Sequence, residues 1–152
     1  MAVRIGSARH DENGRYAGGR KGDQTGNEVS IQNFYVHRKG WIVLRPKSVA
    51  HADMIGERMY RACGNPNIGY CQSHRSSIYK YGTATNTPCE CDCSSLVSTC
   101  CIAAGLSESI FFAGNNMRTT YNLIDACNKT GHFDILTSSN YTRSKDYLNM
   151  ES

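Results

Sequence analysis

The sequence predicts a single α+β domain over residues 1–152. The length is that of one ordinary domain, and the content of 39% hydrophobic and 20% charged residues is typical of a globular protein. Short runs of β-branched and aromatic residues, which favour strands, alternate with longer runs that carry apolar residues at helical spacing. We find no internal repeat and no domain linker, so a second domain is not expected.

The N-terminal third is expected to hold turns and one hairpin. Residues 1–26 are rich in Gly, Asp, Asn and Arg, a composition typical of turns rather than of regular structure. The segments EVSIQNFYV and GWIVLRP then combine β-branched and aromatic residues around the polar break HRKG. This pattern predicts a β-hairpin that ends at Pro46.

Three helices and one strand are expected after Pro46. Ser48 can cap a helix that reaches about residue 63, and Gly131 can end a helix that spans roughly residues 117–130. A central helix is expected from residue 93 to residue 105, and HFDILTS is expected to form a short strand. The apolar positions that predict core faces are Val49, Ala52, Ile55, Met59 and Ala62 in the first helix, and Leu96, Val97, Cys100, Cys101 and Ala104 in the central one.

Charge and hydropathy limit the classes of partner. The first fifty residues carry a net charge of +5, but the basic residues are spread between glycines rather than striped along one helix. This leaves a solvated basic face or an anionic wall polymer open, and it does not favour nucleic acid. No apolar run approaches the roughly 18 residues of a membrane span, and the start MAVRIGSARHDENG lacks a secretion signal. We therefore expect a protein made in the cytoplasm, without a membrane partner and with reduced thiols.

The segment PCECDCSSLVSTCC holds five of the eight cysteines. Structural zinc sites favour paired C-x₂-C ligands, whereas CECDC spaces its cysteines by one, so no metal site is expected. Helical spacing assigns Cys100, Cys101 and Cys127 to the core. Four further cysteines are expected to take no part in chemistry. Cys63 and Cys71 flank a turn, and Cys89 and Cys91 lie just before the central helix.

Cys93 differs from the other cysteines because it is expected in the first turn of a helix. Unpaired backbone N–H groups and the helix dipole stabilise a thiolate there, which makes Cys93 a candidate nucleophile. Its own N–H could stabilise an oxyanion. The alternative is a cysteine beside a helix cap that performs no chemistry.

DCSSLV at residues 92–97, preceded by IGYCQSHR at residues 68–75, resembles the NlpC-type papain-like cysteine peptidases of bacteriophage peptidoglycan hydrolases. GDQTGNEV and FYVHRKGWIVLRP resemble the opening of phage endolysin catalytic domains, so the resemblance runs from the first residues to about Tyr147. It implies a papain-like fold, in which the central helix with its cysteine packs on an antiparallel sheet. It also implies cleavage of an amide bond in the peptide part of peptidoglycan, with no cofactor.

The resemblance assigns roles to individual residues. Cys93 matches the nucleophile, and Tyr70 matches a tyrosine that lines the active site, where its hydroxyl could hold the reacting carbonyl. Gln72 and Arg75 match positions that could contact substrate or a loop, and an ordinary surface role is the alternative for both. Ser94 is expected to cap the helix or to contact substrate. Two roles are open for Asp23 and Gln24: they face the groove, or they only form a glycine-framed turn.

The sequence departs from the family pattern at its C-terminal end. The family places its catalytic histidine downstream, in a segment like GHTVMV that residues 1–152 do not contain. We therefore expect a domain that is C-terminally truncated relative to the family and a catalytic base beyond Ser152, with His132 as a fallback and His74 as a weaker candidate. The absent strands would leave an open sheet edge at which another chain could pair.

Three functions remain open on the sequence. The first is a phage endolysin-type peptidoglycan hydrolase, made in the host cytoplasm and acting at the cell wall. The alternative is a non-catalytic wall-binding or phage structural protein on the same scaffold. The third is a zinc-binding nucleic-acid module built on CECDC with Cys100 and Cys101.

Overall fold

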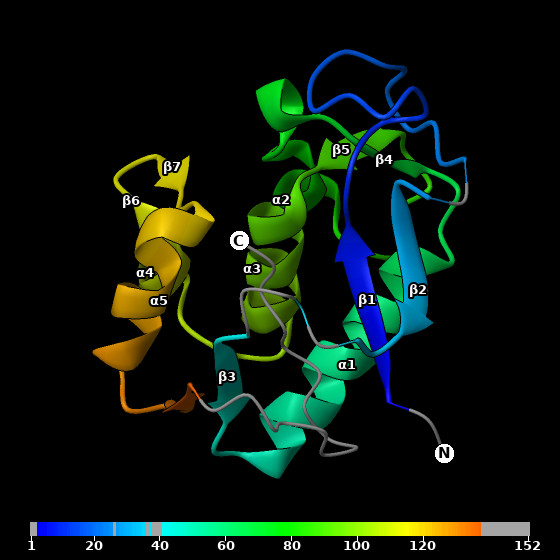
Figure 1. The fold of residues 1–152 in the computed structure, drawn as a ribbon. Coiled ribbons are helices and arrows are strands. Elements are labelled where there is room, and N and C mark those ends of the chain that lie inside the picture. The colour runs from blue at the N-terminus through cyan, green and yellow to red at the C-terminus, as the bar shows by residue number, and fades with distance from the viewer. Residues whose placement is uncertain (1–2, 26, 36, 38–40, 138–152) are drawn as a thin grey trace.

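The computed structural model describes residues 3–25, 27–35, 37 and 41–137. Figure 1 shows their arrangement, with α3 in the middle of the molecule, α1 below it, the β1–β2 sheet on one side and α4 with α5 on the other. The helices are α1 (Val49–Cys63), α2 (Ser77–Tyr81), α3 (Cys93–Ala103), α4 (Glu108–Phe111), α5 (Thr120–Asn128) and the 3₁₀ turn η1 (Gln72–His74). The strands are β1 (Arg4–Ala8), β2 (Val29–Asn33), β3 (Val43–Pro46), β4 (Ile68–Tyr70), β5 (Cys89–Cys91), β6 (Phe112–Ala113), β7 (Asn116–Met117) and β8 (Phe133–Leu136).

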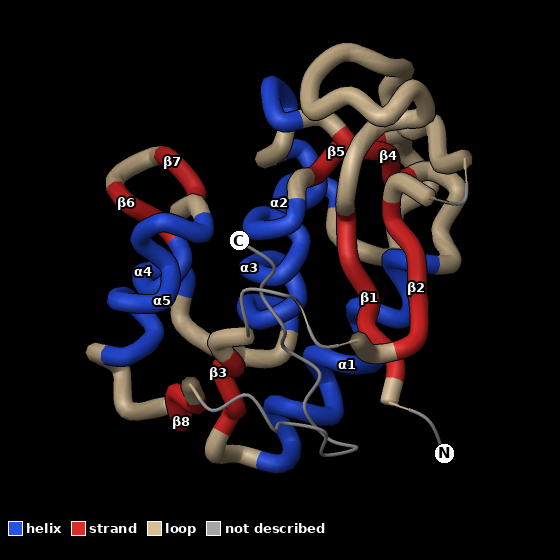
Figure 2. Tube along the Cα trace, in the orientation of Figure 1, coloured by secondary structure: helices blue, strands red, loops and turns tan. Residues whose placement is uncertain are grey.

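The strands of the described residues pair two by two (Figure 2). The β1–β2, β3–β8 and β6–β7 pairs are antiparallel, and the β4–β5 pair is parallel. The predicted mixture of helices and strands is thus confirmed. The expected antiparallel sheet beside the central helix is replaced, within the described ranges, by these separate two-stranded sheets.

The predicted hairpin is wrong, although both of its strands exist. β2 pairs with β1 and β3 pairs with β8, so each strand has a partner distant in sequence. Alternating residues identify a strand but carry no information about its partner when the connection is long. β1 also lies within residues 1–26, which were expected to form turns only.

A close approach explains the glycine within β1. A Cβ on Gly6 would lie 2.5 Å from Met59 Cγ, so a larger residue would push β1 away from α1. The glycine that argued for a turn in the sequence therefore serves packing between a strand and a helix.

The predicted helices α1 and α3 are confirmed, and they pack against each other. Ser48 caps α1, because its Oγ accepts a hydrogen bond from the N–H of His51 at 3.2 Å. Cys100, Cys101 and Cys127 are each at most 1% exposed, which confirms their predicted place in the core. The core residues contributed by the two helices include Ile55, Met59, Ala62, Leu96, Val97 and Ala104, whereas Ala52 is partly buried and Val49 is exposed.

The third predicted helix is shorter than expected. α5 covers Thr120–Asn128, while Met117 belongs to β7. The expected strand in HFDILTS is present as β8. None of the helices in the described ranges is long and apolar enough to cross a membrane.

Candidate active site

Asp92 fixes the start of α3 and thereby the position of Cys93. Asp92 Oδ1 accepts a hydrogen bond from the Ser95 N–H at 2.8 Å, and Ser95 Oγ accepts one from the Asp92 N–H at 2.9 Å. This reciprocal capping box makes Cys93 the first helical residue, as the sequence predicts. The cap is Asp92 rather than Ser94, and the signal that identifies it is the D-x-x-S spacing.

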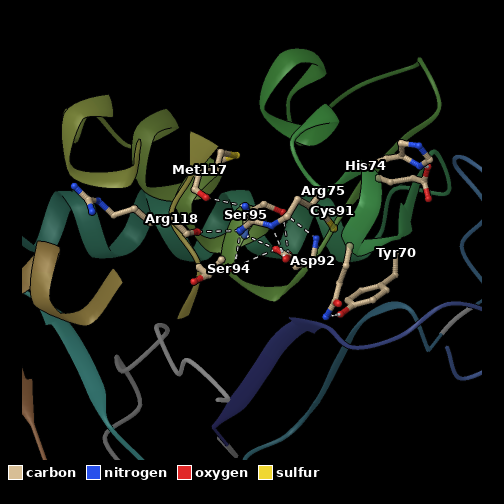
Figure 3. A network of polar contacts seen from close by, with 12 residues as sticks. Tyr70, His74, Arg75, Cys91, Asp92, Ser94, Ser95, Met117 and Arg118 are labelled. Atoms are coloured by element: carbon tan, nitrogen blue, oxygen red, sulfur yellow. Dashed lines mark hydrogen bonds and ion pairs between the residues drawn. The ribbon is translucent and has the colours of Figure 1, made fainter. Parts of the chain in front are cut away.

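Arg75 connects the segment after β4 to the start of α3 (Figure 3). Its Nε donates to Asp92 Oδ2 at 2.5 Å, and its Nη2 donates to Ser94 Oγ at 2.7 Å. Nη1 and Nη2 also donate to the backbone carbonyls of Met117 and Arg118, at 2.8 and 2.9 Å. The guanidinium thus holds together η1, α3 and the strand β7. All four bonds connect Arg75 to other parts of the protein. The substrate contact expected of Arg75 stays a prediction.

Ser94 lies inside this network. Its side chain donates to Asp92 Oδ1 at 3.1 Å and accepts from Arg75, and the residue is 2% exposed. These bonds hold the helix start in place. The substrate contact expected of Ser94 stays a prediction.

Tyr70 is the last residue of β4 and lies opposite Cys91 in the parallel β4–β5 pair, so it is close to the start of α3. Its hydroxyl accepts a hydrogen bond from Gln72 Nε2 at 3.2 Å. Burial raises the pKa of Tyr70 to about 12, and the charge of Cys93 acts in the same direction. Tyr70 is therefore a neutral phenol near Cys93. Its hydroxyl proton can be donated to a third group.

Glu28 supports Tyr70 from the loop between β1 and β2. Glu28 Oε2 accepts a hydrogen bond from the Tyr70 N–H at 2.9 Å, and the residue is 1% exposed. Desolvation by burial raises the pKa of this carboxyl. The buried Glu28 side chain thus holds the backbone of Tyr70 in place.

The turn that contains Asp23 and Gln24 packs directly on β4. A Cβ on Gly69 would lie 2.7 Å from the backbone oxygen of Asp23, so glycine is required there for the loop to approach the strand. Gln24 Nε2 donates to the Val29 carbonyl at 3.0 Å, which closes the loop onto β2. These contacts correspond to the turn that was expected as one of the two roles of the pair.

The Cys93 thiol is half-buried, and its ionisation is opposed by its surroundings. Burial raises the pKa of Cys93, and the Asp92 carboxylate raises it further. The N–H groups of Ser94 and Cys93 and the Arg75 guanidinium lower this pKa but do not outweigh burial. The expected stabilisation by the helix start is present, yet the thiol is protonated at neutral pH, because desolvation is the larger effect.

All eight cysteines lie in the described part of the chain. Six are buried, and only Cys63 and Cys93 are half-buried. Burial raises the pKa of Cys63 to about 11. Cys93 is thus the only accessible thiol at the beginning of a helix.

His132 lies at the opposite end of α3 from Cys93. Its ring is 6.4 Å from that of His51, and His51 Nε2 is 3.9 Å from the place of a Cβ on Gly105, which follows α3. The eleven residues of α3 span about 16 Å. The structure therefore separates the fallback base His132 from the candidate nucleophile.

The other histidines contact other groups. His74 Nδ1 lies near Cys71 and Glu90, His10 Nδ1 lies 2.8 Å from the Asp11 carbonyl, and the ring of His37 is 5.7 Å from that of Trp41. None of these contacts involves Cys93.

The ligand set of the hypothetical zinc-binding nucleic-acid module is not assembled. Among the described residues, the one group of three or more His, Cys, Asp or Glu side chains that could share a metal ion is Cys71, His74 and Glu90. It contains none of the CECDC cysteines and neither Cys100 nor Cys101. The sequence interpretation overlooked it, although the C-x₂-H spacing of Cys71 and His74 was a usable signal.

A family model described as the endolysin-like domain matches residues 5–150. The chain belongs to the endolysin-like domain family. Comparisons with curated proteins and with solved structures gave no match. For this endolysin-like domain the family indicates a phage lytic function, that of a cell-wall hydrolase with peptidoglycan as its substrate. The predicted endolysin-type domain is thereby confirmed, while the NlpC-type cysteine peptidase stays a prediction.

Proposed function

We propose that this endolysin-like domain cleaves an amide bond in the peptide part of peptidoglycan with Cys93 as the nucleophile, on a papain-like scaffold. The observation that carries the proposal is the position of Cys93 as a half-buried thiol at the first residue of α3. The helix start is rigidly capped, so the thiol and the adjacent N–H groups have a fixed geometry. A fixed nucleophile beside hydrogen-bond donors suits acyl transfer.

The first chemical step forms a bond between Cys93 Sγ and the carbonyl carbon. The carbonyl oxygen becomes an oxyanion, and we assign its stabilisation to the Cys93 N–H and the Tyr70 hydroxyl. Tyr70 can donate its proton because its hydroxyl already accepts from Gln72 and its raised pKa, about 12, keeps it neutral. Collapse of this intermediate breaks the C–N bond and leaves a thioester, and water then releases the acid.

The nucleophile requires a base, because burial raises the pKa of Cys93. His132 lies beyond the other end of α3, and His74 faces Cys71 and Glu90. We propose that an imidazole serves as this base, as the resemblance to the NlpC-type peptidases implies. This imidazole would take the thiol proton and later deliver it to the leaving amine.

The proposal also includes the setting in which the domain acts. The domain is made in the host cytoplasm and reaches the wall at lysis or injection. Pairing of another chain with a sheet edge of this domain is part of the same proposal.

Release of new amino groups from purified peptidoglycan by the full-length gene product tests the proposal. Cys93→Ala should abolish release, and Cys93→Ser should reduce it at least about a thousandfold, since a serine hydroxyl is a much weaker nucleophile. Cys63→Ala, which removes the other half-buried thiol, is the matched control and should keep full activity. Amine release retained by Cys93→Ala would refute the proposed nucleophile.

The pH dependence of Cys93 alkylation in residues 1–152 provides a second test. Because burial raises the pKa of this thiol, the rate should be low at neutral pH and should rise to a higher pH than for a free thiol. Binding to walls without amine release from the full-length product would instead support the wall-binding alternative.

A further inference from the structure

Three potential metal ligands converge beside the β4–β5 pair. Cys71 follows β4, His74 ends η1, and Glu90 is the middle residue of β5. One ligand atom from each lies within 4.8 Å of the others. The three residues supply sulfur, nitrogen and oxygen, a donor set that suits Zn²⁺.

The separations fit the edges of a zinc tetrahedron. Cys71 Sγ lies 3.7 Å from His74 Nδ1, and His74 Nδ1 lies 3.2 Å from Glu90 Oε1. Zinc bonds of about 2.3 Å to sulfur and about 2.0–2.2 Å to nitrogen and oxygen place such ligands about 3.4–3.6 Å apart at tetrahedral angles. Small side-chain movements would therefore bring all three atoms onto one ion.

The arrangement differs from a catalytic triad. In a Cys-His-Glu relay, one imidazole nitrogen faces the thiol and the other faces the carboxylate. Here the same nitrogen, His74 Nδ1, faces both Cys71 and Glu90. One ligand atom from each of the three residues thus lies near the other two, as ligands of a shared metal ion must.

The surroundings hold the ligands in place and leave one side open. Ser77 Oγ accepts from the Glu90 N–H at 2.7 Å and lies 3.0 Å from the His74 carbonyl, so it joins the two ligand backbones. The Cys71 N–H donates to the Cys91 carbonyl at 3.0 Å. Cys71 and Glu90 are buried, whereas the His74 side chain is 69% exposed beside a hollow of about 320 Å³ that Gly18, Gly19 and Lys21 also line. A fourth ligand could enter from this side.

We propose that Cys71, His74 and Glu90 bind one Zn²⁺ ion, with the fourth coordination position open to water. On binding, the Cys71 thiol releases its proton to solvent and the thiolate bonds to the ion. The metal would join the end of β4 to β5, next to Tyr70 on one strand and to Asp92 after the other. It would thus stabilise the backbone that supports the proposed active site.

Titration of the metal-free protein with Zn²⁺, in competition with a chromophoric chelator, tests the site. The wild-type chain should bind one equivalent. Cys71→Ser, His74→Ala and Glu90→Gln should each weaken binding by more than the about 10–100-fold typical of changes outside the ligand shell. Cys63→Ser and His51→Ala remove a thiol and an imidazole elsewhere and should keep wild-type affinity.

Cobalt(II) in place of zinc reports the sulfur ligand directly. The wild type and Cys63→Ser should show a thiolate-to-cobalt charge-transfer band that Cys71→Ser lacks. If Cys71→Ser fails to fold, His74→Ala decides the question, because its exposed side chain can be removed without opening the core. Binding of less than one equivalent by the wild type, or unchanged affinity in His74→Ala, would overturn the proposal. These readouts do not depend on hydrolysis, so they are separate from the test of Cys93.

Discussion

Residues 71–75 and 90–94 build two polar clusters of opposite character. In the Arg75 network, the guanidinium donates to two side chains and two carbonyls, and Arg75 and Asp92 side chains are only 16% and 9% exposed. In the second cluster, Cys71, His74 and Glu90 converge on one point, and the imidazole is mostly exposed. The first cluster has its hydrogen bonds made within the protein, as positioning requires, whereas the second leaves its imidazole exposed on the side from which the proposed metal ion would enter.

Removal of Arg75 should produce the largest effect and break this contrast most directly. Arg75→Ala leaves the Asp92 carboxylate without its ion pair and two carbonyls without donors. Loss of one partner of a buried pair costs about 3–5 kcal/mol, and urea unfolding of the metal-free chain should show a fall of this size in the free energy of unfolding. Exposed Arg61→Ala on α1 serves as the control and should shift it by less than about 0.5 kcal/mol. A comparably small change for Arg75→Ala would show that the network does not hold the helix start.

A double-mutant cycle between Arg75 and Asp92 should show a smaller but diagnostic coupling. Asp92→Asn keeps an oxygen for the Ser95 N–H but removes the charge that faces Arg75. The double variant Arg75→Ala/Asp92→Asn should therefore be less destabilised than the sum of the single variants, by about 0.5–3 kcal/mol. Strict additivity, measured by the same unfolding assay, would mean that the two side chains act independently.

The sequence predicted those parts of the site that depend on neighbouring residues. The start of α3 at Cys93 follows from local capping chemistry, and the buried cysteines of α3 follow from helical spacing. The two clusters instead depend on the parallel pairing of β4 with β5, which are three residues each and too short to show a strand pattern. Gly6 misled the interpretation for a related reason, because it allows close packing between β1 and α1, which its local sequence cannot reveal.

The second cluster should respond weakly to loss of its exposed member and more to loss of its scaffold. In the metal-free chain, His74→Ala should lower the free energy of unfolding by less than Arg75→Ala does, because the ring is mostly in solvent and only its Nδ1 faces the buried Glu90 carboxylate. Ser77→Ala leaves the buried Glu90 N–H without its acceptor, a loss worth about 1–3 kcal/mol, and it should also weaken zinc binding by loosening two ligand backbones. Exposed Ser73→Ala, in η1 beside the same ligands, should change neither property. Thermal and urea unfolding with and without Zn²⁺ measures both the free energy of unfolding and the stabilisation by bound zinc. If His74→Ala destabilised the metal-free chain as much as Arg75→Ala, the two clusters would share one structural role and the contrast between them would fail.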